Sequence, residues 1–267
     1  MTQRFPAVYC VENAANLFLI EERGTILSCL ASKRFTLLHN GNCWRGAMIG
    51  AVYTNPLRRG EGLASRLLEQ AVETLRKCGM DFAVLWTQQP AFYARLGWTS
   101  ADSSVLGEFK NDTGFAEPAD EITRTPAPAI DCGYIERIRR RWCGCLTPRR
   151  LEDYRQLPLP AMTVDMLAWG TGVDQSAYAL VGNDGETNIL YELVGHPDGF
   201  RALWAEARRG CRRMLANDAS DSVSYRWLAQ NTGLVWSRKP LAMWLSLSAK
   251  VDMARFAHWH IPYFDRI

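Results

Sequence analysis

A glycine-rich turn set between an apolar run and an amphipathic one constrains this chain more than any other feature of its sequence. Residues 47–54 are mostly apolar, β-branched or aromatic and stop before Asn55-Pro56, which predicts a buried strand ended by a proline. The turn Arg59-Gly60-Glu61-Gly62 comes next. Over residues 63–75, leucine, alanine and valine recur at helical spacing opposite glutamate, glutamine and arginine. The pattern therefore predicts a strand, a glycine loop and an amphipathic helix.

The glycine loop has the properties of an anion site. Glycines ahead of a helix leave backbone N–H groups unpaired at its N-terminus, where the helix dipole also favours negative charge. A side chain at Gly60 or Gly62 would keep the backbone away from a ligand, and glycine also permits positive φ. On this feature alone, a tight turn that binds nothing is the alternative. A Walker-type loop is excluded because Gly-Lys-Ser/Thr is missing, and a dinucleotide fingerprint because only two of its three glycines are present.

The residues after the helix add a second motif. Residues 82–86 predict another buried strand, and residues 90–96 predict a short helix ended by Gly97. Arg59-x-x-Gly62-x-Ala64, with Phe92-Tyr93-x-x-x-Gly97-Trp98 about thirty residues later, closely resembles the acyl-CoA signature of the GNAT superfamily of N-acetyltransferases. The resemblance implies that acetyl-CoA is the acyl donor.

The resemblance also implies roles for individual residues. In that family the loop amides hold the CoA diphosphate, the strand before the loop splays from its neighbour and binds the pantetheine, and the aromatic pair lies along the pantetheine. The tyrosine of that pair often serves as general acid, which corresponds to Tyr93. The matching cofactor-binding positions here are Val52, Tyr53, Thr54, Arg59, Gly60, Glu61, Gly62, Leu63, Ala64, Ser65 and Phe92.

The fold class implied by this resemblance is α/β (α+β), with tandem GNAT-like domains, each a mixed, mostly antiparallel twisted sheet flanked by helices. Residues 16–22 and 25–38 predict the antiparallel strands that lead up to the strand before the loop. Only about fifteen residues precede them, so we expect this domain to lack the two leading helices usual in the family. We expect the catalytic GNAT domain to span residues 1–115.

The second half repeats the layout of the first. A linker rich in proline, threonine and acids is expected at residues 116–129, and a degenerate GNAT-like domain at 130–267. Its expected elements are helices at 134–142, 151–157, 197–216 and 222–230, and strands at 166–169, 177–181, 188–194 and 243–248. The loop Gly195-His196-Pro197-Asp198-Gly199 lacks the Arg-x-x-Gly-x-Ala motif, so it should not bind CoA. This tandem layout resembles acetyltransferases of the enhanced-intracellular-survival type and mycothiol synthase.

Bulk properties fit a globular protein with small-molecule substrates. The chain has 267 residues, of which 48% are hydrophobic, and a net charge of +3 does not favour a nucleic-acid partner. A signal peptide and a run of membrane-spanning length are missing, which predicts a cytoplasmic protein with no membrane partner. The eight cysteines are then expected to be reduced thiols. The sequence leaves monomer and homo-oligomer both open.

These motifs are compatible with three functions. The first is an acetyl-CoA-dependent N-acetyltransferase acting on a primary amine of a small molecule, with Tyr93 as general acid. The second is a catalytically silent acyl-CoA-binding sensor that keeps the loop but lacks a base. The third is an RNA-directed acyl transferase. The candidates for the base that deprotonates the amine are Glu192, His39 and the C-terminal carboxylate of Ile267.

Two further groups of residues could bind a ligand. Arg137, Arg139, Arg140 and Arg141, with Arg149, Arg150 and Arg155, form a basic cluster that could meet RNA or the CoA 3′-phosphate, or be a solvated helix face. Cys143-Gly-Cys145 and His258-Trp-His260 contain zinc-ligand residue types without zinc-finger or ribbon spacing, so no metal site is expected.

Without its leading helices, the first domain would leave its acceptor side open to water, where an amine is poorly oriented and costly to deprotonate. We therefore expect the second domain to contribute acceptor-site residues, from the 188–194 strand and the aromatic tail at 259–264.

Overall fold

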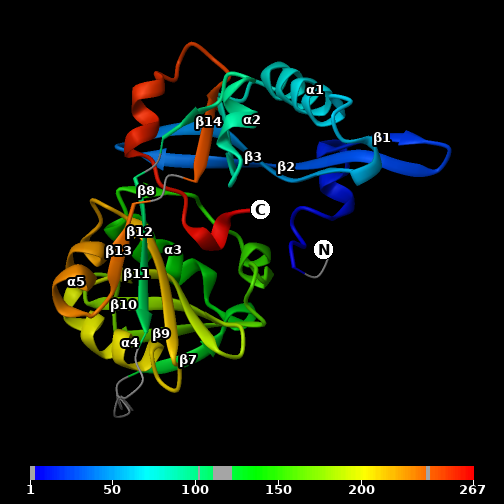
Figure 1. Cartoon of the computed structure of the whole chain (residues 1–267). Helices are drawn as coiled ribbons and strands as arrows, with labels where there is room; N and C mark the ends of the chain where they lie inside the picture. Colours follow the sequence, from blue (N-terminus) through cyan, green and yellow to red (C-terminus); the bar gives the residue numbers. More distant parts are fainter. Residues whose placement is uncertain (1–3, 102, 111–121, 239–240) are drawn as a thin grey trace. The chain divides into compact units, whose positions relative to one another are not determined.

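The structure is a computed structural model, and it describes residues 4–101, 103–110, 122–238 and 241–267 (Figure 1). The chain divides into two compact units. Unit 1 comprises residues 1–102, 240–259 and 267, and unit 2 comprises residues 103–239 and 260–266. Each unit is built around one mixed sheet with helices against it, as the sequence predicts.

The sheet of unit 1 has the strand order β1-β2-β3-β4-β14-β5. The β3–β4 pair is parallel, and the other neighbours along this path are antiparallel. The hairpin between the first two strands turns at Arg23 and Gly24, both with positive φ, as expected of this turn. The bounds are β1 Leu17–Glu22, β2 Thr25–His39, β3 Asn42–Thr54, β4 Phe82–Trp86, β5 Thr99–Ser100 and β14 Ala242–Ser246.

The predicted amphipathic helix of unit 1 is confirmed as α1 (Leu63–Lys77), which packs along the first three strands (Figure 1). Its buried residues are Leu63, Leu67, Leu68, Ala71, Val72 and Leu75, which are the apolar positions of the sequence pattern. The short predicted helix is α2 (Pro90–Ala94). The described residues of this unit also form the 3₁₀ helices η1 Val11–Asn16, η2 Pro56–Arg58 and η6 Met253–His258.

Strand β14 was expected in the second domain, but it lies in the sheet of unit 1 between β4 and β5. Its Trp244 is fully buried and packs on Phe82 of β4, with ring centroids 5.6 Å apart, and on Phe256, at 5.2 Å. Trp259 joins the same aromatic cluster, 4.9 Å from Phe82. Burial of these large rings explains why a strand so far along the chain completes this sheet.

The sheet of unit 2 has the order β13-β6-β12-β11-β10-β9-β7, with β11 and β12 parallel and the other pairs antiparallel. Alternate residues of β10 pack on opposite faces: Ala177 and Ala179 with α4 and α5, Tyr178 and Leu180 with α3. The strands of this sheet are β6 Ser104–Lys110, β7 Thr123–Pro126, β9 Thr163–Gly170, β10 Ser176–Asn183, β11 Thr187–Gly195, β12 Arg213–Ala219 and β13 Val235–Ser237. The short strand β8 Cys145–Leu146 also belongs to unit 2 but is not part of this sheet. The helices are η3 Ala127–Ala129, α3 Cys132–Trp142, η4 Leu151–Arg155, η5 Pro197–Gly199, α4 Phe200–Ala207, α5 Val223–Asn231 and η7 Tyr263–Asp265.

Two predicted elements of unit 2 are wrong in part. The expected long helix over 197–216 ends at Ala207, because Gly210 turns the chain with φ +71 and Arg213 then opens a buried strand. The expected helix at 151–157 is the 3₁₀ helix η4.

The boundaries between the units also differ from the expected ones at residues 115 and 130. Strand β6 already belongs to the sheet of unit 2. Residues 116–121 of the expected linker lie outside the described residues, and its remaining part contains β7 and η3. The boundary falls before residue 115 because the region predicted as a loop contains strand β6, which pairs with β12 over seven residues.

Buried His260 of unit 2 gives the protein a pH-dependent stability. Its Nδ1 lies 2.9 Å from Ser104 Oγ, and burial together with Arg266 lowers its pKa to about 3; Asp265 opposes this shift. The unfolded chain protonates this histidine near pH 6.5. As pH falls below 6.5, His260 therefore becomes protonated in the unfolded state but stays neutral in the folded state. This difference lowers the free energy of unfolding.

We expect His260 alone to reduce the free energy of unfolding by about 2 kcal/mol between pH 7 and pH 5. His260→Asn keeps a polar atom near Ser104 but removes the titration. Urea unfolding at pH 7, 6 and 5 should therefore show a smaller loss of stability in the variant, and equal slopes for both proteins would contradict this expectation.

Candidate functional site

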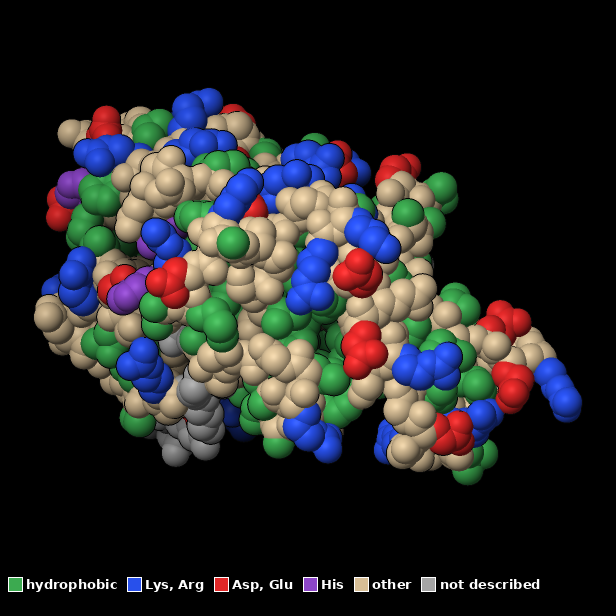
Figure 2. Space-filling model, turned by 90° about the horizontal axis from the view of Figure 1, so that it is seen from above, with side chains coloured by type: hydrophobic (Ala, Val, Ile, Leu, Met, Phe, Trp, Pro, Cys, Tyr) green, Lys and Arg blue, Asp and Glu red, His purple; other side chains and the backbone are tan. Residues whose placement is uncertain are grey.

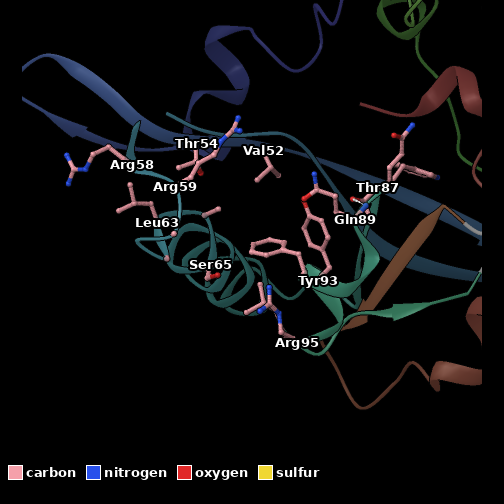
Figure 3. A pocket seen from close by; sticks show the side chains of 17 residues that line it. Val52, Thr54, Arg58, Arg59, Leu63, Ser65, Thr87, Gln89, Tyr93 and Arg95 are labelled. Carbon is pink, nitrogen blue, oxygen red and sulfur yellow. Dashed lines mark hydrogen bonds between the residues drawn. The ribbon is translucent and has the colours of Figure 1, made fainter. Parts of the chain in front are cut away.

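Unit 1 contains a cavity of about 980 Å³ between β3, β4, α1 and α2 (Figure 3). Its walls come from the end of β3, the glycine loop, the first turn of α1, the residues after β4 and one face of α2. The lining residues are Val52, Thr54, Arg58, Arg59, Gly60, Gly62, Leu63, Ala64, Ser65, Trp86, Thr87, Gln88, Gln89, Phe92, Tyr93, Arg95 and Leu96.

The cavity opens where two parallel strands separate. Strands β3 and β4 pair only between Gly46–Met48 and Phe82–Val84. Beyond these pairs β3 continues to Thr54 and β4 to Trp86, so their ends are unpaired with each other. Unpaired backbone N–H and C=O groups on two diverging strands can hydrogen-bond an extended ligand placed between them.

A β-bulge shapes the β3 side of this gap. Cys29 and Ala31 of β2 are two residues apart, whereas their partners Tyr53 and Gly50 of β3 are three residues apart. Within this stretch Ala51 has φ +52. A non-glycine residue in this region is strained. Val52 and Thr54 line the cavity, whereas Tyr53 between them is 46% exposed and its carbonyl accepts a hydrogen bond from Ser28 Oγ (2.7 Å). The bulge therefore sets which β3 side chains face the cavity.

The glycine loop has the backbone that the sequence predicts. Gly60 has φ +87 and Gly62 has φ +75, and a Cβ atom on either would meet nothing within 4 Å. Gly62 is the N-cap of α1 and provides no side-chain cap, so the first N–H groups of the helix remain available to a ligand. Left-handed glycines beside open space, next to a 15-residue helix, are features that could hold an anion.

Three arginines line the cavity, and they differ in their partners. Arg58 pairs with Glu22 (2.9 Å) and Glu61 (2.6 Å), so its charge is balanced by the protein. Among the described residues, no carboxylate lies within ion-pair distance of Arg59 or Arg95. Arg95 lies 6.0 Å from the ring centroid of Phe92. Arg59 and Arg95 therefore supply positive charge that a bound anion could balance.

Tyr93 is the one titratable phenol of the cavity wall within the described part of the chain. Its ring is held edge-on between Phe92 (4.9 Å) and Trp98 (6.3 Å), is 9% exposed, and points into the cavity beside Gln89 (Figure 3). Burial raises the pKa of Tyr93 above its usual value near 10. At neutral pH the hydroxyl is therefore protonated and can donate a proton.

The structure brings together all of the predicted site residues except Tyr53 and Glu61. Tyr53 does not line the cavity and is 46% exposed, and Glu61 instead pairs with Arg58 (2.6 Å). The residues that sequence reasoning missed are Arg58, Trp86, Thr87, Gln88, Gln89, Arg95 and Leu96. Four of these directly end or follow a predicted buried strand, a position at which sites on parallel strands often lie.

The candidates for a general base lie elsewhere. Glu192 belongs to unit 2, where it is buried and accepts two hydrogen bonds from Arg149 (2.7 and 2.8 Å). This ion pair excludes it as a free base. His39 Nδ1 lies 3.2 Å from Trp259 Nε1 and does not line the cavity. The main chain of Ile267 packs against Gly50 of β3.

The predicted basic cluster is not one surface. Arg139 is 1% exposed and Arg149 is 5% exposed, because both neutralise buried carboxylates. Arg141 pairs with Asp174 on the surface (2.8 Å). On the face shown in Figure 2, Lys and Arg side chains are scattered among acidic, polar and apolar ones. Neither alternative, a phosphate-binding surface or a solvated helix face, therefore holds for the two buried members, Arg139 and Arg149.

The described residues contain neither a metal cluster nor a membrane-spanning helix. No three His, Cys, Asp or Glu side chains in them are placed to hold a metal ion. Across the described ranges, every helix is too short or too polar to cross a membrane. All eight cysteines are free thiols.

Comparison with known families identifies the first part of the chain. Residues 4–101 match the family model of the acetyltransferase (GNAT) domain. This part of the chain therefore matches a GNAT domain, as its sequence motifs predict. The matched range contains the glycine loop, both diverging strands and α2, so the whole cavity lies within it. No curated protein matched the sequence.

Solved GNAT structures share the fold of both units. A GCN5-related N-acetyltransferase from Anabaena variabilis aligns over 87% of this chain with a TM-score of 0.67 and 15% identity. Eis1 from Mycobacterium abscessus aligns over 87% (TM-score 0.56, 16% identity), and so does a tandem GNAT protein of the clavulanic acid biosynthesis pathway (TM-score 0.54, 10% identity). The aligned regions span 63%, 64% and 82% of those chains. At these identities the likeness shows the fold, and its extent fits two GNAT-like units.

Proposed function

We propose that this protein is an acyltransferase that uses acetyl-CoA and transfers the acetyl group to a primary amine of a small molecule. The single observation that carries this proposal is the cavity of the GNAT domain. It combines a left-handed glycine cradle at a helix N-terminus, a gap between diverging strands, and a buried tyrosine at the far wall.

The residues present fit the shape and charge of acetyl-CoA. The open space beside Gly60 and Gly62 would receive the diphosphate, with Arg59 and Arg95 balancing its charge. The unpaired end of β3, with Val52 and Thr54, would hydrogen-bond and pack the pantetheine chain. Bound in this way, acetyl-CoA supplies an acetyl thioester to the reaction.

Tyr93 is proposed as the general acid. An amine with a lysine-like pKa near 10.4 must lose a proton before it can attack, which costs about 4 to 5 kcal/mol at pH 7. The leaving thiolate must instead gain a proton. The thiol that it forms has a pKa near 8.5. Tyr93, protonated and facing the cavity, holds a proton for that purpose.

One observation favours a second function, an acyl-CoA-binding sensor without turnover. None of the residues that line the described cavity is Asp, Glu or His, so no conventional base faces it. In a sensor, binding of the acyl-CoA would be the whole function. The RNA-directed alternative loses support, since Arg139 and Arg149 are buried.

Acetyl-CoA titration and a turnover assay separate these functions. Calorimetry with acetyl-CoA should show binding, and a thiol reagent should then report CoA release that depends on added amines from a panel. Binding together with amine-dependent release supports the transferase. Binding without release for any amine, combined with unchanged amines by mass spectrometry, supports the sensor. Failure of acetyl-CoA to bind the intact chain would contradict both.

A further inference from the structure

Unit 2 contains a second pair of diverging parallel strands. Strands β11 and β12 pair only between Thr187–Leu190 and Arg213–Ala216. After these pairs β11 continues to Gly195 and β12 to Ala219. The β3–β4 pair of unit 1 diverges in the same way, and there the gap opens into the cavity. Unit 2 thus has the framework of a ligand cleft.

The loop that would hold an anion in this cleft is closed by packing. A Cβ atom on Gly195 would lie 2.3 Å from the Ser176 carbonyl oxygen, and one on Gly199 would lie 2.5 Å from the Trp169 ring. These glycines allow close contact with the protein itself, whereas Gly60 and Gly62 border open space. The two glycines of the unit 2 loop are therefore used for internal packing and do not border an opening like the one beside Gly60 and Gly62.

Residues 260–266 bind the two diverging strands in place of a ligand. Arg149 donates to Asp265 (2.6 and 2.9 Å) and to Glu192 of β11 (2.7 and 2.8 Å). Arg266 donates to Asn217 Oδ1 of β12 (2.9 Å). Both contacts lie past the last β11–β12 pair. Asp265, acting through Arg149, and Arg266 thus link one strand to the other at a point where the strands are no longer hydrogen-bonded to each other.

Other residues of this segment are buried as well. Ile261 and Phe264 are at most 1% exposed, and Asp265 is 3% exposed. The Tyr263 ring stacks on Tyr191 of β11, with centroids 5.6 Å apart and ring planes 13° apart. His260 lies 2.9 Å from Ser104 of β6.

The charged groups of segment 260–266 are complementary to those of the residues around it, as in a protein–peptide interface. Asp265 also accepts a hydrogen bond from Thr147 (2.6 Å), and Arg139 lies 3.8 Å from it. A buried carboxylate held by two arginines and a hydroxyl is well compensated, and without Asp265 the buried Nε of Arg149 would lose the oxygen to which it donates.

We propose that the cleft between β11 and β12 is a peptide-binding site whose ligand is the chain's own segment 260–266. Arg149, Glu192 and Asn217 form the charged and polar part of the site, and Asp265 and Arg266 are the groups they recognise. The gap between strands that is proposed to hold acetyl-CoA in the GNAT domain has a counterpart in unit 2 that anchors residues 260–266. Unit 2 therefore binds no acetyl-CoA, and the intact chain binds at most one.

Hydrogen exchange measured by mass spectrometry tests this proposal on the full chain without any CoA. In the wild-type protein, the amides of residues 260–266 should exchange as slowly as those of β11. In Asp265→Asn, which keeps the shape but removes the charge facing Arg149, exchange across 260–266 should be at least about tenfold faster. The matched control is Asp174→Asn, which removes an exposed carboxylate paired with Arg141 and should leave the segment unchanged.

Two outcomes would overturn the proposal. One is exchange of 260–266 at the rate of an exposed loop in the wild-type chain, which can be measured even if Asp265→Asn fails to fold. The other is an unchanged segment in a folded Asp265→Asn protein. Calorimetric binding of two acetyl-CoA molecules per chain would also contradict it. Lack of any acetyl-CoA binding would instead contradict only the proposed function, because the exchange experiment contains no CoA.

Discussion

Replacing Tyr93 with phenylalanine should lower kcat for amine-dependent CoA release by about 10²- to 10⁴-fold, the usual contribution of a general acid. The ring is fixed between Phe92 and Trp98, so phenylalanine fills the same space and only the proton donor is lost. Acetyl-CoA affinity, measured by calorimetry, should change little. Steady-state kinetics with a thiol reagent gives kcat, once an amine acceptor has been found.

Tyr53→Phe is the matched control, because Tyr53 is a neighbouring β3 tyrosine that does not line the cavity and is 46% exposed. It should keep wild-type kcat. A folded Tyr93→Phe protein with wild-type kcat and wild-type affinity would refute the acid role. If only the affinity falls, Tyr93 acts in binding and another group supplies the proton.

The local elements of the GNAT domain could be predicted because short-range signals agree there. The apolar spacing of residues 63–75 gives α1, the proline at 56 ends β3, and glycines at 60 and 62 adopt the expected left-handed backbone. These features depend on residues a few positions apart, which is the range over which a single sequence is informative. The cavity residues near the two motifs could be predicted from the same signals.

Long-range pairing was not predictable from such signals. The residue pattern at 242–246 indicates a strand. No signal in the neighbouring sequence indicates that this strand pairs with β4 and not with strands close to it in the chain. The choice is made by burial of Trp244 on Phe82, some 160 residues away. A fragment ending near residue 115 would lack this strand and would expose Phe82, so it is not a fair test of the catalytic domain.

The burial and pairing of charged residues could not be predicted from the sequence either. Arg139, Arg149 and Glu192 have the composition of a solvated surface, and charge runs usually are one. In the structure they form a compensated cluster around Asp265, which lies more than a hundred residues from the two arginines. A sequence pattern reports charge but not its partner, so both the basic-surface hypothesis and the Glu192 base hypothesis failed for the same physical reason.

Replacing Gly62 with valine should weaken acetyl-CoA binding by about 100-fold or more. The residue has φ +75, which a β-branched side chain disfavours by about 1 to 2 kcal/mol. Its Cβ would also occupy the open space in which the loop amides meet a diphosphate. Loss of two hydrogen bonds to a charged group, at about 1.5 to 3 kcal/mol each, corresponds to at least this change in affinity.

Gly24→Val separates the two effects of that substitution. Gly24 has φ +79 in the β1–β2 turn, nothing lies within 4 Å of its Cβ position, and it does not line the cavity. Both variants should therefore lose similar stability in urea unfolding, but only Gly62→Val should lose affinity in calorimetry. If the two variants bind acetyl-CoA equally well, the cradle at the start of α1 does not hold the diphosphate, and Arg59 and Arg95 would have to provide the anion site alone.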